Sequence, residues 1–154
     1  MATIYHQVGI MAPVGTVYEA LSDPGRIGTW WDAQTPVQTD RGLVLEHSPG
    51  PSHGVVRLLV VERALNSRVE WECISTHPES SPASAWTGTR FVFELTDKGA
   101  DSFWSMLAGD QGPVTILDFR QIGYDERSRF FGFNNFAWGQ VLANLKRVLE
   151  APRK

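Results

Sequence analysis

The chain has 154 residues, of which 42% are hydrophobic and 20% are charged. This size and composition indicate one folded domain and exclude a disordered chain. The net charge of −3, with acidic and basic residues interspersed, argues against a nucleic-acid partner or a membrane-surface helix. No apolar run approaches the ~18 residues that a membrane span needs.

The first residues have neither the basic start nor the long apolar stretch of a signal peptide. The single cysteine, Cys73, cannot form a disulfide bond within the chain, which is typical of a reducing compartment. We therefore expect a cytoplasmic protein. We also expect Cys73 to be a small buried hydrophobe, because no basic residue stands beside it to activate its thiol.

The chain begins with a predicted strand over residues 3–11, in which apolar side chains alternate with others. His6 shares the apolar face of this strand with Ile4, Val8 and Ile10. Two short helices follow, because proline at a first helical position and aspartate at a cap favour helix starts. They are expected over residues 14–21 and from Asp23-Pro24 to near Trp30-Trp31.

Six further strands are predicted from alternating or β-branched segments that proline and glycine separate. Pro78 ends the fourth of these, because proline cannot donate a hydrogen bond to a neighbouring strand. Residues 78–85 are expected to form a loop. Residues 98–113 have two possible structures: a long hairpin end, or a hairpin end that includes a helical turn at residues 103–107. The strands are expected over residues 35–40, 43–47, 54–64, 68–77, 88–97 and 114–124.

A long C-terminal helix is predicted to begin after Asp125, a good N-cap, and to end at Pro152. Asn134 falls within its apolar stripe, whereas Phe133 and Phe136 fall on the opposite side. The first half of this helix is therefore apolar all round, and loops, a bend or a partner chain must cover it. A homodimer is one candidate. The stripe consists of Phe131, Trp138, Leu142, Leu145 and Leu149.

This order of elements favours a single α+β domain over residues 1–154. A curved antiparallel sheet of about six to seven strands would wrap around the long C-terminal helix, with two short helices after the first strand. Both apolar faces are then buried. The concave side of the sheet need not be filled by the helix, so a cavity between them is the expected ligand site.

Five segments, taken in order, resemble one superfamily. They are residues 12–24 (APVGTVYEALSDP), Trp30-Trp31, residues 86–93 (WTGTRFVF), Gly123-Tyr124 and the pattern Phe133-x-x-Phe136-x-Trp138-x-x-x-Leu142-x-x-Leu145. The chain resembles the Bet v 1-like, START-related superfamily called SRPBCC, in the branch named for activators of the heat-shock-protein-90 ATPase. The resemblance covers nearly the whole chain. It implies a helix-grip fold with a pocket for an apolar or aromatic small molecule.

The chain also departs from this pattern. Gln121 stands near the place where related sequences often carry a histidine before the final Gly-aromatic pair, so a proton-transfer role is not carried over. Residues 97–113 are longer than the usual hairpin. The eukaryotic chaperone activator has a separate domain for chaperone contact, which 154 residues do not accommodate.

Six Trp, eight Phe and three Tyr supply many stiff rings for a core or a pocket wall. Trp31, Trp71 and Phe119 are expected to form pocket walls, and Trp138 to anchor the core. Phe91 and Phe93 belong to the same aromatic set. The expected ligand-binding residues are His6, Trp31, Arg57, Trp71, Phe91, Phe93, Phe119, Gln121, Asn134 and Trp138.

Four of these candidates are polar, and each has a structural alternative. His6 is either a core histidine with one hydrogen bond or a pocket group that moves a proton. Gln121 and Asn134 either bind a ligand carbonyl or hydroxyl or close the helix onto the sheet. Arg57 pairs with a ligand carboxylate if it points inward and is a solvated charge if it points outward.

No cofactor is expected, and the four histidines lack the spacing of metal ligands. The motif Gly50-Pro51-Ser52-His53-Gly54 matches G-x-S-x-G, but a strand rather than a helix follows it, so we expect a surface loop and no nucleophile. No catalytic residue is therefore assigned.

The expected function is binding of a small apolar or aromatic molecule in this cavity, and two alternative functions remain open. The first alternative is an enzyme of the cyclase or aromatase type, acting through polar groups such as His6, Gln121, Asn134 and Tyr124. The second is regulation of a chaperone ATPase through a protein surface.

Overall fold

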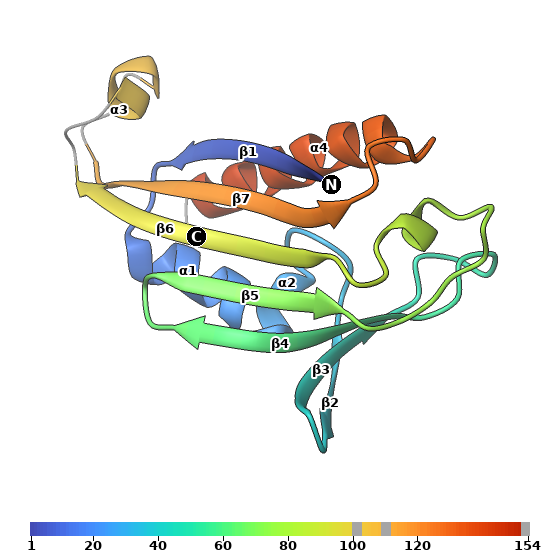
Figure 1. Cartoon of the computed structure of the whole chain (residues 1–154). Coiled ribbons are helices and arrows are strands. Elements are labelled where there is room, and N and C mark those ends of the chain that lie inside the picture. The colour runs from blue at the N-terminus through green and yellow to red at the C-terminus, as the bar shows by residue number, and fades with distance from the viewer. Residues whose placement is uncertain (100–102, 109–111, 152–154) are drawn as a thin grey trace.

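Figure 1 shows the computed structural model, which describes residues 1–99, 103–108 and 112–151. The described residues form one antiparallel sheet of seven strands in the order β1-β7-β6-β5-β4-β3-β2. The strands are β1 (Ala2–Ile10), β2 (Thr35–Thr39), β3 (Gly42–His47), β4 (Val56–Ala64), β5 (Arg68–Cys73), β6 (Arg90–Gly99) and β7 (Val114–Tyr124). The helices are α1 (Val14–Ser22), α2 (Pro24–Ile27), α3 (Phe103–Ala108) and α4 (Phe131–Glu150), with a 3₁₀ turn, η1 (Pro82–Ala85).

Helices α1, α2 and α4 lie on one face of the sheet, with α4 alongside β1 (Figure 1). This arrangement confirms the expected α+β helix-grip architecture. No described helix packs over the middle of the opposite face of the sheet, and α3 projects beyond the end of β6 and β7 (Figure 1). Of the two alternatives left open for residues 98–113, the structure has the one with a helical turn, α3 at Phe103–Ala108. Residues 100–102 and 109–111 lie outside the described part of the chain.

The sequence misplaced the ends of three strands. The strand expected over 68–77 ends at Cys73, because the hydroxyl of Ser75, rather than a backbone carbonyl, accepts from the Arg57 N–H at 3.0 Å. The strands expected from residues 54 and 88 begin two residues later. Gly54 and Gly88 have φ angles of +73° and +81° there, which an extended strand does not use.

Two predicted helix boundaries were wrong, the end of α2 and the start of α4. Asp23 caps α2 as expected, since its Oδ1 accepts from the Gly25 N–H at 3.0 Å, but α2 ends at Ile27 and turns continue to Trp30. The long helix α4 begins at Phe131 and not after Asp125. The Asp125 carboxylate accepts from the Arg127 N–H at 3.0 Å instead, so it caps a turn that precedes the helix.

The faces of α4 agree with its sequence pattern. Its buried residues are Asn134, Trp138, Leu142 and Leu145. Phe133 and Phe136, expected on the opposite side, are 56% and 65% exposed. The predicted end at Pro152 lies outside the described residues.

Aromatic rings fill most of the space between the sheet and α4. Trp71 on β5, Phe91 and Phe93 on β6 and Phe119 on β7 are at most 1% exposed. Trp138 reaches this layer from α4, with its ring centroid 4.6 Å from that of Phe119 and 5.5 Å from that of Phe91. The centre of the expected cavity is therefore packed, and any open space must lie at its edge.

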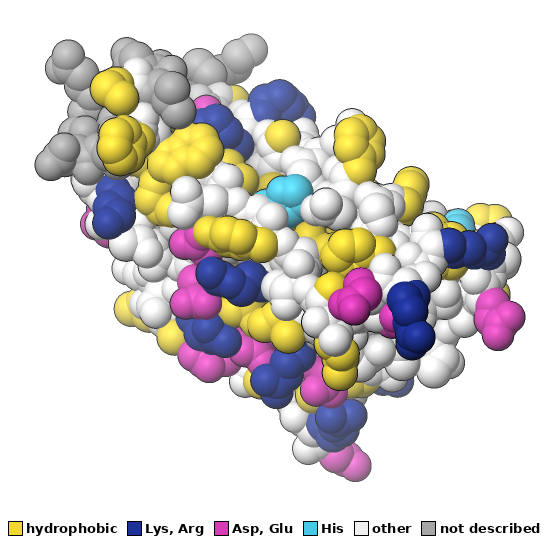
Figure 2. Space-filling model, turned by 45° about the horizontal axis from the view of Figure 1, so that its top comes forward, with side chains coloured by type: hydrophobic (Ala, Val, Ile, Leu, Met, Phe, Trp, Pro, Cys, Tyr) yellow, Lys and Arg dark blue, Asp and Glu magenta, His cyan; other side chains and the backbone are white. Residues whose placement is uncertain are grey.

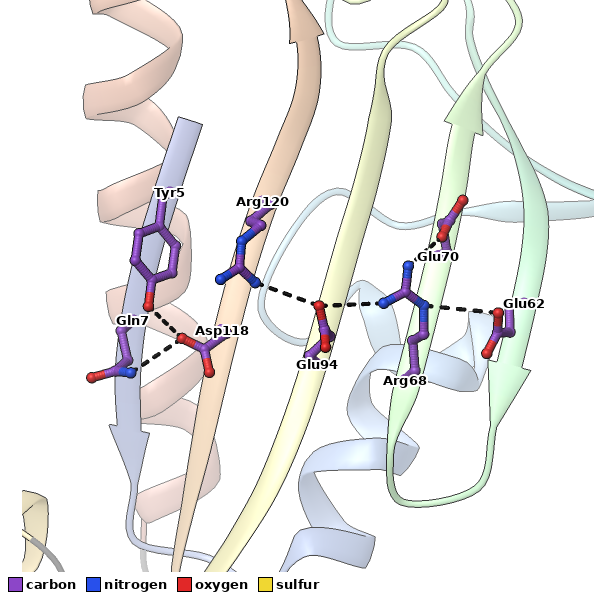
Figure 3. A network of polar contacts seen from close by, with 8 residues as sticks. All are labelled: Tyr5, Gln7, Glu62, Arg68, Glu70, Glu94, Asp118 and Arg120. Atoms are coloured by element: carbon purple, nitrogen blue, oxygen red, sulfur yellow. Dashed lines mark hydrogen bonds and ion pairs between the residues drawn. The ribbon is translucent and has the colours of Figure 1, made fainter. Parts of the chain in front are cut away.

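The outer face of the sheet carries interleaved basic and acidic side chains (Figure 2). Figure 3 shows how they connect across neighbouring strands. Arg120 and Arg68 both reach the Glu94 carboxylate, at 3.4 and 3.3 Å. Arg68 also contacts Glu70 at 2.7 Å, and the second oxygen of Glu70 lies 3.1 Å from Arg90. Glu70 thus joins two arginines.

We expect Glu70→Ala to lower the free energy of unfolding by about 2 kcal/mol, because its side chain is only 5% exposed and accepts two charge-assisted contacts. Glu62→Ala is the matched control on the same face. Its carboxylate is 48% exposed and reaches Arg68 at 3.8 Å, so a change within about 0.5 kcal/mol is expected. Urea unfolding measures both. Equal losses for the two variants would contradict this account.

Candidate ligand-binding pocket

A pocket of about 240 Å³ opens at the edge of the aromatic layer, between the first turns of α4, η1 and the loop that follows β3. These segments meet at one end of the sheet (Figure 1). The pocket combines aromatic, apolar and polar side chains. It is lined by Trp31, Asp32, His47, Pro49, His53, Val56, Ser81, Pro82, Ala83, Trp86, Phe133, Asn134 and Ala137.

Two tryptophans connect this pocket to the core. The Trp31 ring stacks on Trp71 with centroids 6.0 Å apart and an interplanar angle of 9°. The Trp86 ring lies 5.2 Å from Phe91 and 6.1 Å from Trp138. Both pocket tryptophans are therefore braced by buried rings, which fixes the flat surfaces that they offer to a ligand.

His47 is one of the buried polar residues that line the pocket, together with Ser81 and Asn134. The Gln34 side-chain amide donates to the Asp32 carbonyl at 2.8 Å, which turns its oxygen toward His47 Nδ1 at 3.0 Å. In the neutral ring, Nδ1–H therefore donates to Gln34. This leaves Nε2 as an acceptor, 3.5 Å from the Asp32 carboxylate. Burial lowers the pKa of His47, while Asp32 raises it by a smaller amount.

We expect this burial to make the protein less stable in acid. The unfolded state takes up a proton on His47 near the ordinary pKa of about 6.5, whereas the folded state takes it up at lower pH. The stabilisation is thus present at neutral pH and is lost as the pH falls below about 6.5. Urea unfolding between about pH 7.5 and about pH 5.5 measures this loss. His47→Gln should reduce the dependence, and a parallel decline in that variant would contradict the assignment.

A series of hydrogen bonds holds the wall of the pocket that the loops form. His53 Nδ1 lies 2.6 Å from the Ser81 hydroxyl, and the Ser81 oxygen also accepts from the Ala83 N–H at 3.1 Å. His77 Nδ1 donates to the backbone carbonyl of His53 at 2.6 Å, and its Nε2 lies 2.8 Å from the Ser75 hydroxyl. These bonds tie the 50–54 loop to η1, so it is a structured wall. Its turn conformation agrees with the expected loop.

The structure separates the ten expected site residues into three groups. Trp31 and Asn134 line the pocket. Six others are buried in or beside the aromatic layer behind it: Trp71, Phe91, Phe93, Phe119, Gln121 and Trp138. The remaining two, His6 and Arg57, are not among the lining residues.

His6 and Arg57 have other partners. His6 Nε2 lies 3.0 Å from the backbone carbonyl of Asn135, where the absence of a side chain at Gly139 lets α4 approach the ring. Arg57 Nε donates to Glu46 at 2.8 Å, and its side chain is 41% exposed. Arg57 thus has the outward position of its structural alternative. His6 makes one hydrogen bond to the backbone but is only partly buried, so it is not a core histidine.

Sequence reasoning missed several lining residues, above all His47, His53 and Trp86. His47 lies at the end of its strand, with Pro49 soon after it. His53 and Trp86 lie in loops, where no periodicity assigns a face. Their mutual approach depends on how the loops fold back, which the sequence pattern does not encode.

Among the described residues, no group of three or more His, Cys, Asp and Glu side chains is arranged to hold a metal ion. None of the described helices is long and apolar enough to cross a membrane. Cys73 is buried, and burial raises the pKa of its thiol.

No protein-family model matches the sequence, and neither does any curated protein. Solved structures do share its fold. The solution structure of the Aha1 dimer from Colwellia psychrerythraea is 22% identical with a TM-score of 0.73, and the match covers 100% of both chains. A crystal structure of a Mesorhizobium loti protein is 19% identical with a TM-score of 0.74, over 99% of this chain and 100% of that one.

DynU16, described as a protein in the dynemicin biosynthetic locus, is 17% identical with a TM-score of 0.63. The match covers 97% of this chain and 47% of DynU16. At these identities the comparisons establish the fold. The chain shares the fold of these structures, as the resemblance in the sequence indicated.

Proposed function

We propose that this protein binds a small aromatic molecule in the pocket at the edge of the aromatic layer. The observation that carries the proposal is the pair Trp31 and Trp86, which line the pocket and are each braced by buried rings. Rigid flat surfaces favour stacking with a planar ligand. The exposed Phe133 adds a third ring at the rim.

The volume of the pocket limits the size of this ligand. About 240 Å³ is below the roughly 300–1,000 Å³ of pockets that enclose drug-sized ligands. A cavity of roughly 150 Å³ is enough for benzene. A molecule of one or two rings therefore fits, whereas a long acyl chain or a large fused-ring system does not fit without rearrangement of the core.

Isothermal titration calorimetry with ethylbenzene, 4-ethylphenol, naphthalene and 2-naphthol tests the proposal. Binding of at least one of them with 1:1 stoichiometry is expected. Phe133→Ala should weaken it several-fold, because Phe133 lines the pocket. Phe103→Ala is the matched control, since this phenylalanine is also exposed, on α3, but is not a lining residue. Absence of binding by all four compounds, or equal effects of both variants, would overturn the proposal.

A second candidate function is acid–base chemistry on the bound molecule. It is favoured by His47, whose Nε2 is an acceptor beside Asp32 in the pocket and whose lowered pKa keeps the ring neutral near pH 7. Deuterium exchange of the acidic C–H groups of 2-tetralone in D₂O, followed by NMR, tests for a base there. Exchange above the buffer rate that His47→Gln abolishes supports this function, and exchange at the buffer rate rejects it.

We also propose that the protein forms a homodimer through the exposed start of α4. Phe136 leaves an apolar ring in solvent on this helix, and the Aha1 structure with the same fold is that of a dimer. Light scattering should give twice the chain mass of 17.2 kDa, and Phe136→Glu should reduce it to one chain. A single-chain mass for the unmodified protein at micromolar concentration would reject the dimer.

A further inference from the structure

Two hydrogen-bond acceptors face each other in the lining of the pocket. One is Nε2 of His47 and the other is a carboxylate oxygen of Asp32, 3.5 Å away. The Nδ1–H of His47 donates to Gln34 at 3.0 Å, so the neutral ring carries no hydrogen on Nε2. No hydrogen therefore lies between the two atoms, which we call the acceptor pair.

The protein leaves the acceptor pair without a donor. No described residue donates a hydrogen bond to His47 Nε2 or to the Asp32 carboxylate. The His47 side chain is only 3% exposed, whereas that of Asp32 is 52% exposed. Burial lowers the pKa of His47, so at neutral pH the ring does not take up the proton that would pair it with Asp32. A buried acceptor in this state gains free energy when a donor reaches it.

The charge of the lining favours a cation. Among the described residues that line the pocket there is one acidic residue, Asp32, and no lysine or arginine. The chain as a whole has a net charge of −3. Trp31 borders the acceptor pair, since its ring centroid lies 4.8 Å from that of His47. The face of an indole attracts a cation within about 6 Å, so Trp31 adds to the attraction.

These features select one of the polar groups that an aromatic ligand can carry. A carboxylate brings further acceptors and a negative charge against Asp32. A hydroxyl group has one hydrogen to share between two acceptors, and no charge. An ammonium group has three N–H donors and a positive charge, so it supplies a donor to both acceptors and pairs with the Asp32 carboxylate.

We propose that the ligand of this pocket is an arylalkyl amine in its ammonium form, and that Asp32 and His47 Nε2 bind the ammonium group beside Trp31. The aromatic ring of the ligand occupies the rest of the pocket. The proposal rests on the proposed binding function and names the chemical class of its ligand.

Calorimetry at neutral pH with three compounds of matched shape tests the proposal. 2-Phenylethylamine, 2-phenylethanol and 3-phenylpropionate share a ring and a two-carbon chain, which ends in an ammonium, a hydroxyl and a carboxylate group. We expect the amine to bind roughly tenfold more tightly than the alcohol, because its hydrogen bonds to the acceptor pair are charge-assisted. The carboxylate should bind more weakly than the alcohol.

Asp32→Asn should reduce the preference for the amine over the alcohol to within about twofold. The substitution removes the charge, and the new amide can itself donate to His47 Nε2. Asp40→Asn is the matched control, because Asp40 is an exposed aspartate in the turn between β2 and β3 and does not line the pocket. It removes the same charge from the chain and should keep the preference.

Two further measurements keep the outcomes distinct. 2-Phenylethanol should bind Asp32→Asn within about twofold of its affinity for the unmodified protein, which shows that the pocket of the variant is intact. If Asp32→Asn does not fold, Asp32→Ser replaces it and should also lose the preference.

The proposal is overturned if the unmodified protein binds the amine no more tightly than the alcohol. It is also overturned if Asp32→Asn binds the alcohol normally and keeps the full preference for the amine. Failure of these three compounds and of ethylbenzene alike to bind would instead reject the binding function itself, so the two proposals fail by different results.

Discussion

Trp138→Ala is expected to lower the free energy of unfolding by about 3–5 kcal/mol, the usual loss when a buried tryptophan is truncated. Trp138 is 2% exposed and lies at the centre of the aromatic layer. Its ring centroid is 4.6 Å from that of Phe119, 5.1 Å from that of Trp31 and 5.5 Å from that of Phe91. The substitution removes contacts with β6, β7 and the segment after α2, and the rings held by the two strands cannot collapse into the void.

Urea unfolding followed by circular dichroism measures this loss. Trp104→Ala is the control, because Trp104 lies half-exposed on α3, where it packs on Gly9 of β1. A loss of about 1 kcal/mol is expected there. Domains of this size have total stabilities of about 5–15 kcal/mol, so this loss removes between about a fifth and all of the stability. Equal losses for the two tryptophans would contradict a core centred on Trp138.

Trp31→Ala is expected to weaken binding of a planar aromatic ligand by about 30-fold, as truncation of a central stacking residue does at binding sites. Trp31 lines the pocket and stacks on Trp71, and its ring centroid lies 4.8 Å from that of His47. Its loss therefore removes one flat wall. It also loosens the ring of His47, which borders the same space.

Trp31→Phe provides the graded comparison, because it keeps an aromatic ring at the same place. Its affinity should lie between those of the unmodified protein and Trp31→Ala. Thermal unfolding of each variant shows whether the fold is kept. If folded Trp31→Ala binds the planar ligand as tightly as the unmodified protein does, the ligand does not stack in this pocket.

The fold could be predicted from the sequence where one physical rule acts alone. Period-two alternation predicted β7 over residues 114–124, the bounds that the structure shows. The 3.6-residue period likewise separated buried Trp138 from exposed Phe133 on α4. The predicted start of α4 was wrong because an aspartate can cap a turn as well as a helix. The Asp125 carboxylate accepts from the Arg127 N–H within a turn that precedes α4.

The site was less predictable, because it is assembled from loops. Trp31 and Asn134, which line the pocket, were expected there only as members of an inward face. His53 and Trp86 depend on contacts between η1 and the 50–54 loop, which join residues 28 positions apart in the case of His53 and Ser81. For His6 the predicted strand face was correct. Its contact with α4 could not be predicted, because it depends on Gly139, which leaves room for the His6 ring.

The most direct test of the central claim is a ¹H–¹⁵N NMR titration of the six tryptophan indole N–H groups with 4-ethylphenol. The indole signals of Trp31 and Trp86 should shift in a saturable manner, because both side chains line the pocket. The signal of Trp104, at the far end of the sheet against Gly9, should stay in place. Unchanged signals for Trp31 and Trp86 at saturating ligand, or a shift confined to Trp104, would contradict an aromatic ligand in this pocket.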